Sequence, residues 1–124
     1  MDKRERRRSP RVRLDCKVKV ESIFGTMNGR GRDLSDGGIG VYLAKLPPVD
    51  STVTIRFAVP GSTIDVEATG EVRYHDRGGP GVGDDWVGVK FVRMDAPCQQ
   101  AIHKYVMANY DPAADNGPPI ATDD

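Results

Sequence analysis

The sequence predicts a mostly β fold: a six-stranded antiparallel β-barrel with one C-terminal α-helix packed on it. Three observations support this fold class. Short segments alternate apolar and polar residues with a period of two, which is typical of strands that bury one face. Fourteen glycines and nine prolines in 124 residues supply the turns that short antiparallel strands need. One segment near the C-terminus instead repeats its apolar residues at helical spacing.

Charge divides the chain into three parts. The first thirteen residues carry seven Lys and Arg against two acids, and the last fourteen carry four Asp and no base, although the net charge is zero. We therefore expect a flexible basic arm over residues 1–11, a barrel with its helix over residues 12–110, and a disordered acidic tail over residues 111–124. No segment approaches the roughly 18 apolar residues of a membrane span, so we expect a cytoplasmic protein.

The first half of the barrel is predicted from three strands. Alternating apolar residues over 12–20 indicate the first strand, and Asn28-Gly29 is expected as the corner of the following hairpin. A more irregular strand then leads to Leu34, which we expect to face the core. Asp36-Gly37-Gly38 turns the chain into a third strand, whose inward row lies within residues 39–43.

Three further strands complete the predicted barrel. Pro47-Pro48 marks a connection, because proline interrupts the hydrogen bonding of a central strand. Alternating apolar residues over 53–59 indicate the fourth strand, and residues 64–74 form a longer fifth strand with a bulge expected at Gly70. The last inward row lies within residues 87–91.

A single helix is predicted over residues 96–109. Asp95 is a suitable N-cap, and Pro97 lies in the first turn, where a missing N–H costs no hydrogen bond. Ile102 and Val106 fall on one side at helical spacing, together with Tyr105 and Asn109. We expect this side to pack on the barrel.

Asp33 and Ser35 form the first half of a candidate binding site. Because Leu34 between them should face inward, both side chains should lie together on the outer face of the barrel. Gly37 and Gly38 allow a positive φ or the close approach of a ligand. A carboxylate accepts hydrogen bonds from paired N–H donors, such as the amino edge of guanine. The alternative is an ordinary hairpin in which the two polar side chains satisfy the turn.

Arginines ahead of the first strand form the second half. Arg6, Arg7, Arg8 and Arg11 lie within six positions, around Pro10. The guanidinium group matches a phosphate or a base edge with a planar set of donors and stacks on flat rings. The alternatives are a solvated basic tail and non-specific affinity for nucleic acid.

The order and spacing of the two halves resemble the PilZ domain, a bacterial receptor module for cyclic di-GMP. Arg7-x-x-x-Arg11 is followed about twenty residues later by Asp33-x-Ser35-x-x-Gly38, and both motifs are intact. The resemblance continues through residues 71–74, the strand at 87–91 and the helix, and so covers about residues 5–108.

The resemblance implies a role for each motif residue. In PilZ domains the two arginines of the first motif bind phosphates and guanine edges, which implies these roles for Arg7 and Arg11. The second motif contacts a guanine from the barrel surface, which implies contacts from Asp33 and Ser35, with Gly38 shaping the turn. PilZ domains with a basic residue just before the first motif arginine tend to bind the ligand as an intercalated dimer. Arg6 occupies this position and Arg8 adds charge, so we expect two nucleotides per chain.

Other candidate residues carry less weight. Trp86 alternates to the outer face, where it could stack on a purine, but we favour a position under the helix. Tyr74 should face the core unless Gly70 shifts its strand. His75 and His103 have no partners at metal-ligand spacing, and we expect both at the surface. We find no catalytic constellation, P-loop or metal motif, and predict neither an enzyme nor a bound cofactor or metal.

Three functions are compatible with the sequence, and we favour the first. A cyclic di-GMP receptor would change conformation on binding and signal to a separate, unidentified protein partner. A small β-barrel that binds RNA or DNA through its basic arm would show strong salt dependence, but the aromatic residues form no exposed stacking row, so nucleic acid is disfavoured. A PilZ scaffold that binds only proteins is disfavoured because both motifs are intact.

Overall fold

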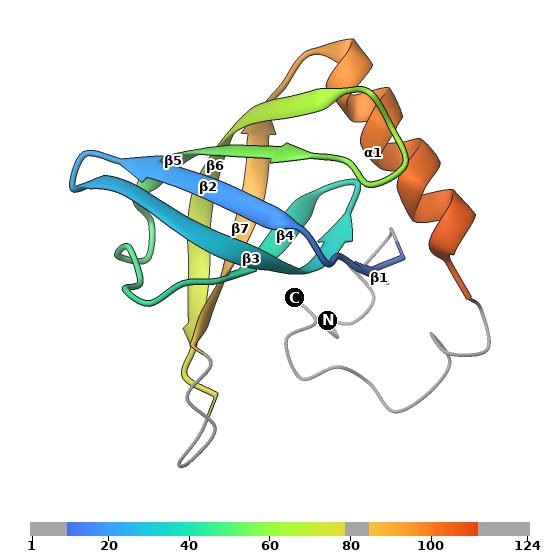
Figure 1. The fold of residues 1–124 in the computed structure, drawn as a ribbon. Coiled ribbons are helices and arrows are strands. Elements are labelled where there is room, and N and C mark those ends of the chain that lie inside the picture. Colours follow the sequence, from blue (N-terminus) through green and yellow to red (C-terminus); the bar gives the residue numbers. More distant parts are fainter. Residues whose placement is uncertain (1–9, 79–84, 112–124) are drawn as a thin grey trace, which may run out of the picture.

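A computed structural model describes residues 10–78 and 85–111 of the chain. In these residues the chain forms seven β-strands and one α-helix (Figure 1). In chain order they are β1 (Val12–Arg13), β2 (Lys17–Ser22), β3 (Gly25–Ser35), β4 (Gly38–Tyr42), β5 (Thr52–Ala58), β6 (Asp65–Asp76), β7 (Trp86–Arg93) and α1 (Ala96–Asn109).

The strands form a closed antiparallel barrel. Their order is β1-β3-β2-β5-β6-β7-β4, and pairing of β3 with β4 closes the sheet on itself. Strands β2 to β7 make the six-stranded barrel, and β1 is an extra short strand that pairs with the end of β3, on the edge opposite to β4. This confirms the predicted fold class. Closure leaves each barrel strand with hydrogen-bonded neighbours on both sides, which removes free sheet edges.

The core is filled by the inward-facing residues of these strands. The alternation in the sequence predicted most of them correctly, because a pleated strand sends every second side chain to the same face. The most deeply buried include Leu14, Val18, Val20, Leu34, Ile39, Val41, Val53, Ile55, Val66, Val72 and Val87 from the barrel and Ile102 and Val106 from the helix.

The first hairpin differs from the prediction. The expected strand over residues 12–20 is interrupted, so that β1 pairs with the end of β3 while β2 pairs with its beginning. Asn28-Gly29 lies within β3, and the corner is at Ile23-Phe24, where Gly25 has a φ of 123°. The position of the corner follows from pairing Val18 with Gly29, a register that aligns the inward-facing row of β2 with that of β3.

Two bulges change which face a side chain occupies. The pairing of β3 with β4 skips Arg32, and the pairing of β6 with β7 skips Arg73. A further register shift lies at Gly70, as the sequence predicted. Because of the shift after Val72, Tyr74 faces outward and its ring lies over Gly88. The expectation that Tyr74 is a core residue is therefore wrong.

The helix begins and packs as the sequence predicted. Asp95 is its N-cap, with its Oδ1 accepting a hydrogen bond from the Cys98 amide at 3.1 Å, and Pro97 lies in the first turn. Helix α1 packs against β1, β3 and β6 and closes one side of the barrel (Figure 1). Within residues 10–78 and 85–111, no helix combines the length and apolar character that crossing a membrane requires.

Candidate functional site

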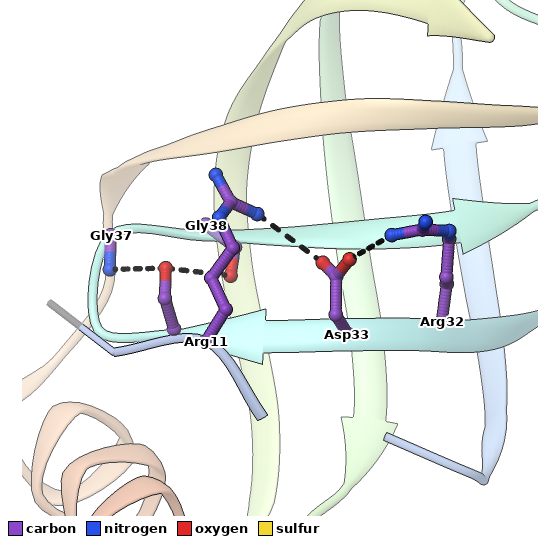
Figure 2. A network of polar contacts seen from close by, with 6 residues as sticks. Arg11, Arg32, Asp33, Gly37 and Gly38 are labelled. Carbon is purple, nitrogen blue, oxygen red and sulfur yellow. Dashed lines mark hydrogen bonds and ion pairs between the residues drawn. The ribbon is translucent and has the colours of Figure 1, made fainter. Parts of the chain in front are cut away.

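Asp33 is the centre of a polar cluster on the outer face of the barrel. Its side chain is buried, with 9% of the residue exposed, and both carboxylate oxygens are used. Nη1 of Arg11 lies 3.3 Å from Oδ1, and Nη1 of Arg32 contacts Oδ2. Figure 2 shows the two guanidinium groups on either side of the carboxylate. Asp33 thus joins the segment ahead of β1 to the barrel wall.

The pairing of β1 with β3 positions Arg11. Val12 pairs with Leu34 and Arg13 pairs with Asp33, which places Arg11 next to the end of β3. The hydroxyl of Tyr105 in α1 donates to the carbonyl oxygen of Arg13 at 3.0 Å. Burial raises the pKa of Tyr105, so this hydroxyl remains a donor throughout the neutral range. Helix and barrel therefore both fix the backbone that carries Arg11.

Among the residues that the structure describes, one donor of Arg11 has no partner. Its Nε is buried and makes no hydrogen bond to the part of the chain that the structure describes. A buried N–H without an acceptor is costly, and most such groups in folded proteins are satisfied. An acceptor from outside the chain, such as a phosphate oxygen, would satisfy it.

Ser35 and Gly38 support the turn beside this cluster. The Ser35 hydroxyl accepts from the Gly37 amide at 3.3 Å and lies 3.5 Å from the Gly38 carbonyl oxygen, to which it donates. Neither Gly37 nor Gly38 has a positive φ. A Cβ at Gly38 would lie 2.5 Å from the carbonyl oxygen of Val89, so Gly38 allows β4 and β7 to approach. In this structure the motif serine satisfies the turn and the motif glycine serves strand packing.

Arg32 extends the cluster to an aromatic pair and was missed by the sequence analysis. Its Cζ lies 4.0 Å from the centroid of the Trp86 ring. Trp86 in turn meets Tyr74 edge-on, with ring centroids 5.5 Å apart and planes at 82°. Trp86 lies at the start of β7, at the opposite end of that strand from α1, so the expectation that the helix covers it is wrong. The sequence does show Arg32 next to Asp33, but in a regular strand two neighbouring side chains face opposite ways. Only the bulge at Arg32 puts both on the outer face.

The described residues therefore bring together four of the seven predicted site residues. Arg11, Asp33 and Gly38 lie where β1, β3 and β4 converge (Figure 2), and Ser35 pairs with Gly38 at the end of β3. Arg6, Arg7 and Arg8 lie outside the described residues. His75 is only half-buried and its Nε2 is 2.6 Å from the carbonyl oxygen of Pro47, and His103 is exposed.

The chemistry of the cluster suits an anion that also carries N–H donors. Two guanidinium groups share one carboxylate, so positive charge is in excess in the cluster. A carboxylate has about four lone-pair positions, so Asp33 can accept from both arginines and still accept from a ligand. Across residues 10–78 and 85–111, no group of three or more His, Cys, Asp or Glu side chains is arranged to hold a metal ion.

Comparison with known proteins gives one family and several structural neighbours. The family model described as PilZ domain matches residues 5–108. The Bacillus subtilis inhibitor of motility MotI/DgrA has a TM-score of 0.74 at 20% identity, covering 83% of this chain and 50% of its own. The PilZ domain of YcgR from Escherichia coli with c-di-GMP has a TM-score of 0.63 at 15% identity, covering 84% of this chain and 91% of its own.

A third neighbour is the K. pneumonia MrkH–c-di-GMP complex, with a TM-score of 0.65 at 19% identity, covering 82% of this chain and 51% of its own. The chain thus spans about half the length of the MotI/DgrA and MrkH chains and nearly all of the isolated YcgR domain. At these identities the likeness shows the fold. No curated protein sequence matches the chain.

Proposed function

This chain belongs to the PilZ domain family, and we propose that it is a receptor for cyclic di-GMP that acts on a separate protein partner. The structures of the YcgR domain and of MrkH with c-di-GMP support the ligand. The site would be the corner at which β1, β3 and β4 meet.

The observation that carries this proposal is the ion pair between Arg11 and Asp33. It brings the second arginine of the first motif within 3.3 Å of the first residue of the second motif. The buried Nε of Arg11 needs an acceptor, and a phosphate oxygen is a strong one. One corner of the barrel thus offers donors for a phosphate and an acceptor for the N–H edge of a guanine.

Each motif residue has a proposed role. Arg7 and Arg11 would bind phosphates and guanine edges, and Asp33 would accept from the N–H groups of a guanine. Ser35 would add a hydroxyl at the base of the site, and Gly38 would keep the turn close to β7.

The neighbouring arginines bear on stoichiometry. Arg6 and Arg8 would add charge against the four phosphates of an intercalated ligand dimer, so we propose two nucleotides per chain. A titration that saturates at one nucleotide per chain would refute this number without affecting the site itself.

Binding would be converted into a signal at the N-terminal segment. With its arginines on the nucleotide, residues 1–11 would close over the corner formed by Asp33 and Ser35. This would change the surface next to the turn at Asp36-Gly37 and the start of β1, which a partner protein could read.

Isothermal titration calorimetry with cyclic di-GMP tests the proposal. The wild-type chain should bind, and Arg7→Ala and Arg11→Ala should abolish binding. Arg13→Ala is the matched control, because it removes the same charge from an exposed side chain only two positions after Arg11. This variant should bind like wild type. Unchanged binding in both motif variants would refute the assignment of Arg7 and Arg11 as ligand-binding residues.

A gel shift with random oligonucleotides separates the nucleic-acid alternative. That alternative requires affinity for polyanions that falls steeply with salt and does not depend on Asp33. The barrel wall is charge-mixed, since Arg56 pairs with Glu21 and Glu67 and Arg30 pairs with Asp15. We therefore expect no specific shift.

A further inference from the structure

Arg32 and Trp86 lie beside the proposed site but have no role in either motif. The guanidinium group of Arg32 contacts Oδ2 of Asp33, and its Cζ lies 4.0 Å from the centroid of the indole ring. One side chain thus connects the acceptor of the site to the only tryptophan of the chain.

The backbone holds Arg32 in this position. The bulge between Gly31 and Asp33 makes Arg32 and Asp33 consecutive residues on the same outer face, which an unbroken strand would not allow. Gly40 lies across from Asp33, and a Cβ there would be 2.8 Å from Oδ1 of Asp33 and 3.3 Å from Cε3 of Trp86. The glycine leaves the space in which carboxylate and indole approach each other.

The indole is itself fixed. Trp86 is only 4% exposed and is held from one side by the edge contact with Tyr74. The Arg32 side chain remains 30% exposed although it lies over the ring. The guanidinium group therefore has the indole on one side and an Asp33 oxygen at one end, and part of its surface is open to solvent.

We propose that Arg32 is a base-stacking residue of the nucleotide site, with its exposed surface against the guanine whose N–H edge Asp33 accepts. This inference rests on the proposed function. A planar base held by Asp33 lies within reach of the group on its Oδ2, and arginine stacks well on flat rings. Trp86 blocks the opposite side of the guanidinium group, so the base would lie on the open side.

A competing role for Arg32, in which it blocks Asp33 from the ligand, predicts the opposite effect of its removal on affinity. If Arg32 only occupied Asp33 in competition with the ligand, its removal would strengthen binding. If it stacks on the base, its removal weakens binding, and the planar guanidinium group matters in addition to the charge.

Fluorescence and calorimetry with cyclic di-GMP test the inference on four full-length proteins: wild type, Arg32→Gln, Arg32→Lys and Arg30→Gln. Arg30→Gln is the matched control, because it removes the same charge from the same strand but from a side chain paired with Asp15. Arg32→Gln should weaken binding by about tenfold or more, since stacking on one base is worth about 1–3 kcal/mol. Arg32→Lys should recover part of this loss, and Arg30→Gln should bind within about twofold of wild type.

Trp86 reports on the same event. Ligand binding should change the tryptophan emission of wild type and Arg30→Gln, because the stack includes the indole. At saturating ligand the change should be much smaller in Arg32→Gln. A side chain that merely stabilised the fold would not link the affinity to this signal.

The outcomes are distinguishable. If wild type does not bind cyclic di-GMP, the proposed function fails. If wild type binds and Arg32→Gln binds equally well or more tightly, the stacking role is overturned and the proposed function stands. Should Arg32→Gln fail to fold in a thermal melt, Arg32→Lys decides: affinity equal to that of Arg30→Gln would overturn the inference.

Discussion

Arg11 and Asp33 are 22 positions apart in the chain, and Nη1 of the first lies 3.3 Å from Oδ1 of the second. The contact exists because β1 pairs with the end of β3 and carries the preceding residue to the outer face of the barrel. The same carboxylate also contacts Arg32, so the guanidinium groups of Arg11 and Arg32 share one counter-charge.

Asp33→Asn should weaken cyclic di-GMP binding by about tenfold or more, measured by calorimetry. An amide has the size of the carboxylate but carries only one acceptor oxygen, and its NH2 group would face an arginine or the ligand's own donors. Because two guanidinium groups would lose their counter-charge, the free energy of unfolding should also fall, by about 1 kcal/mol.

Asp36→Asn is the matched control for this change. The carboxylate of Asp36 lies in the same hairpin but pairs with His103, whose Nδ1 is 2.9 Å from its Oδ2. Its loss should leave nucleotide affinity near the wild-type value. Equal losses in both variants would show that overall charge, and not Asp33, sets the affinity.

Gly38→Ala should destabilise the barrel by about 1–3 kcal/mol in urea unfolding. The new Cβ would lie 2.5 Å from the carbonyl oxygen of Val89, a backbone atom that can move only with β7. Gly37→Ala is the control: a Cβ there meets nothing within 4 Å, so stability should change by about 0.5 kcal/mol or less. Similar effects at both positions would contradict the packing role of Gly38.

Gly88→Ala should displace the Tyr74 ring from the edge of Trp86. A Cβ at Gly88 would overlap that ring, whose centroid lies 5.5 Å from that of the indole. We expect a loss of about 1 kcal/mol in unfolding free energy together with altered tryptophan emission. In a Tyr74→Ala background the same substitution should cost less, and strict additivity in this double-mutant cycle would contradict the overlap.

The N-cap of α1 should contribute to the pH dependence of stability. Hydrogen bonds from the Cys98 side chain and amide lower the pKa of Asp95 below its ordinary value. A depressed pKa in the folded state means that the stabilisation is present above the unfolded-state pKa, about 3.9, and is lost as pH falls through the folded pKa.

Thermal melts between neutral and acidic pH test the N-cap. Asp95→Ala should melt at a lower temperature than wild type at neutral pH, and this difference should shrink in acid. Asp95→Asn should keep most of the cap at neutral pH, since asparagine is also a good N-cap, but should lack the acid-dependent part. A constant difference between wild type and Asp95→Asn at every pH would exclude this role for the charge.

Local patterns in the sequence determined most of the fold. Alternation predicted the inward rows around Val18, Ile55 and Val89, because burial of one strand face demands a period of two. The turn at Asp36-Gly37 and the Asp95 cap were predicted for the same kind of reason: their hydrogen bonds are made within a few residues of the chain. The motif spacing likewise indicated the family, which the match over residues 5–108 confirmed.

The pairing of strands that are distant in sequence decided which faces Arg32 and Tyr74 occupy. The sequence places Leu34 inward and Asp33 outward, but only the bulge against β4 puts Arg32 on the same face as Asp33, and only the bulge against β7 turns Tyr74 outward over Gly88. A bulge is fixed by the register of a partner strand that is distant in sequence, and a shift of one residue exchanges the two faces. The sequence by itself therefore determined the barrel and its motif residues, whereas the tertiary structure decided which side chains surround Asp33.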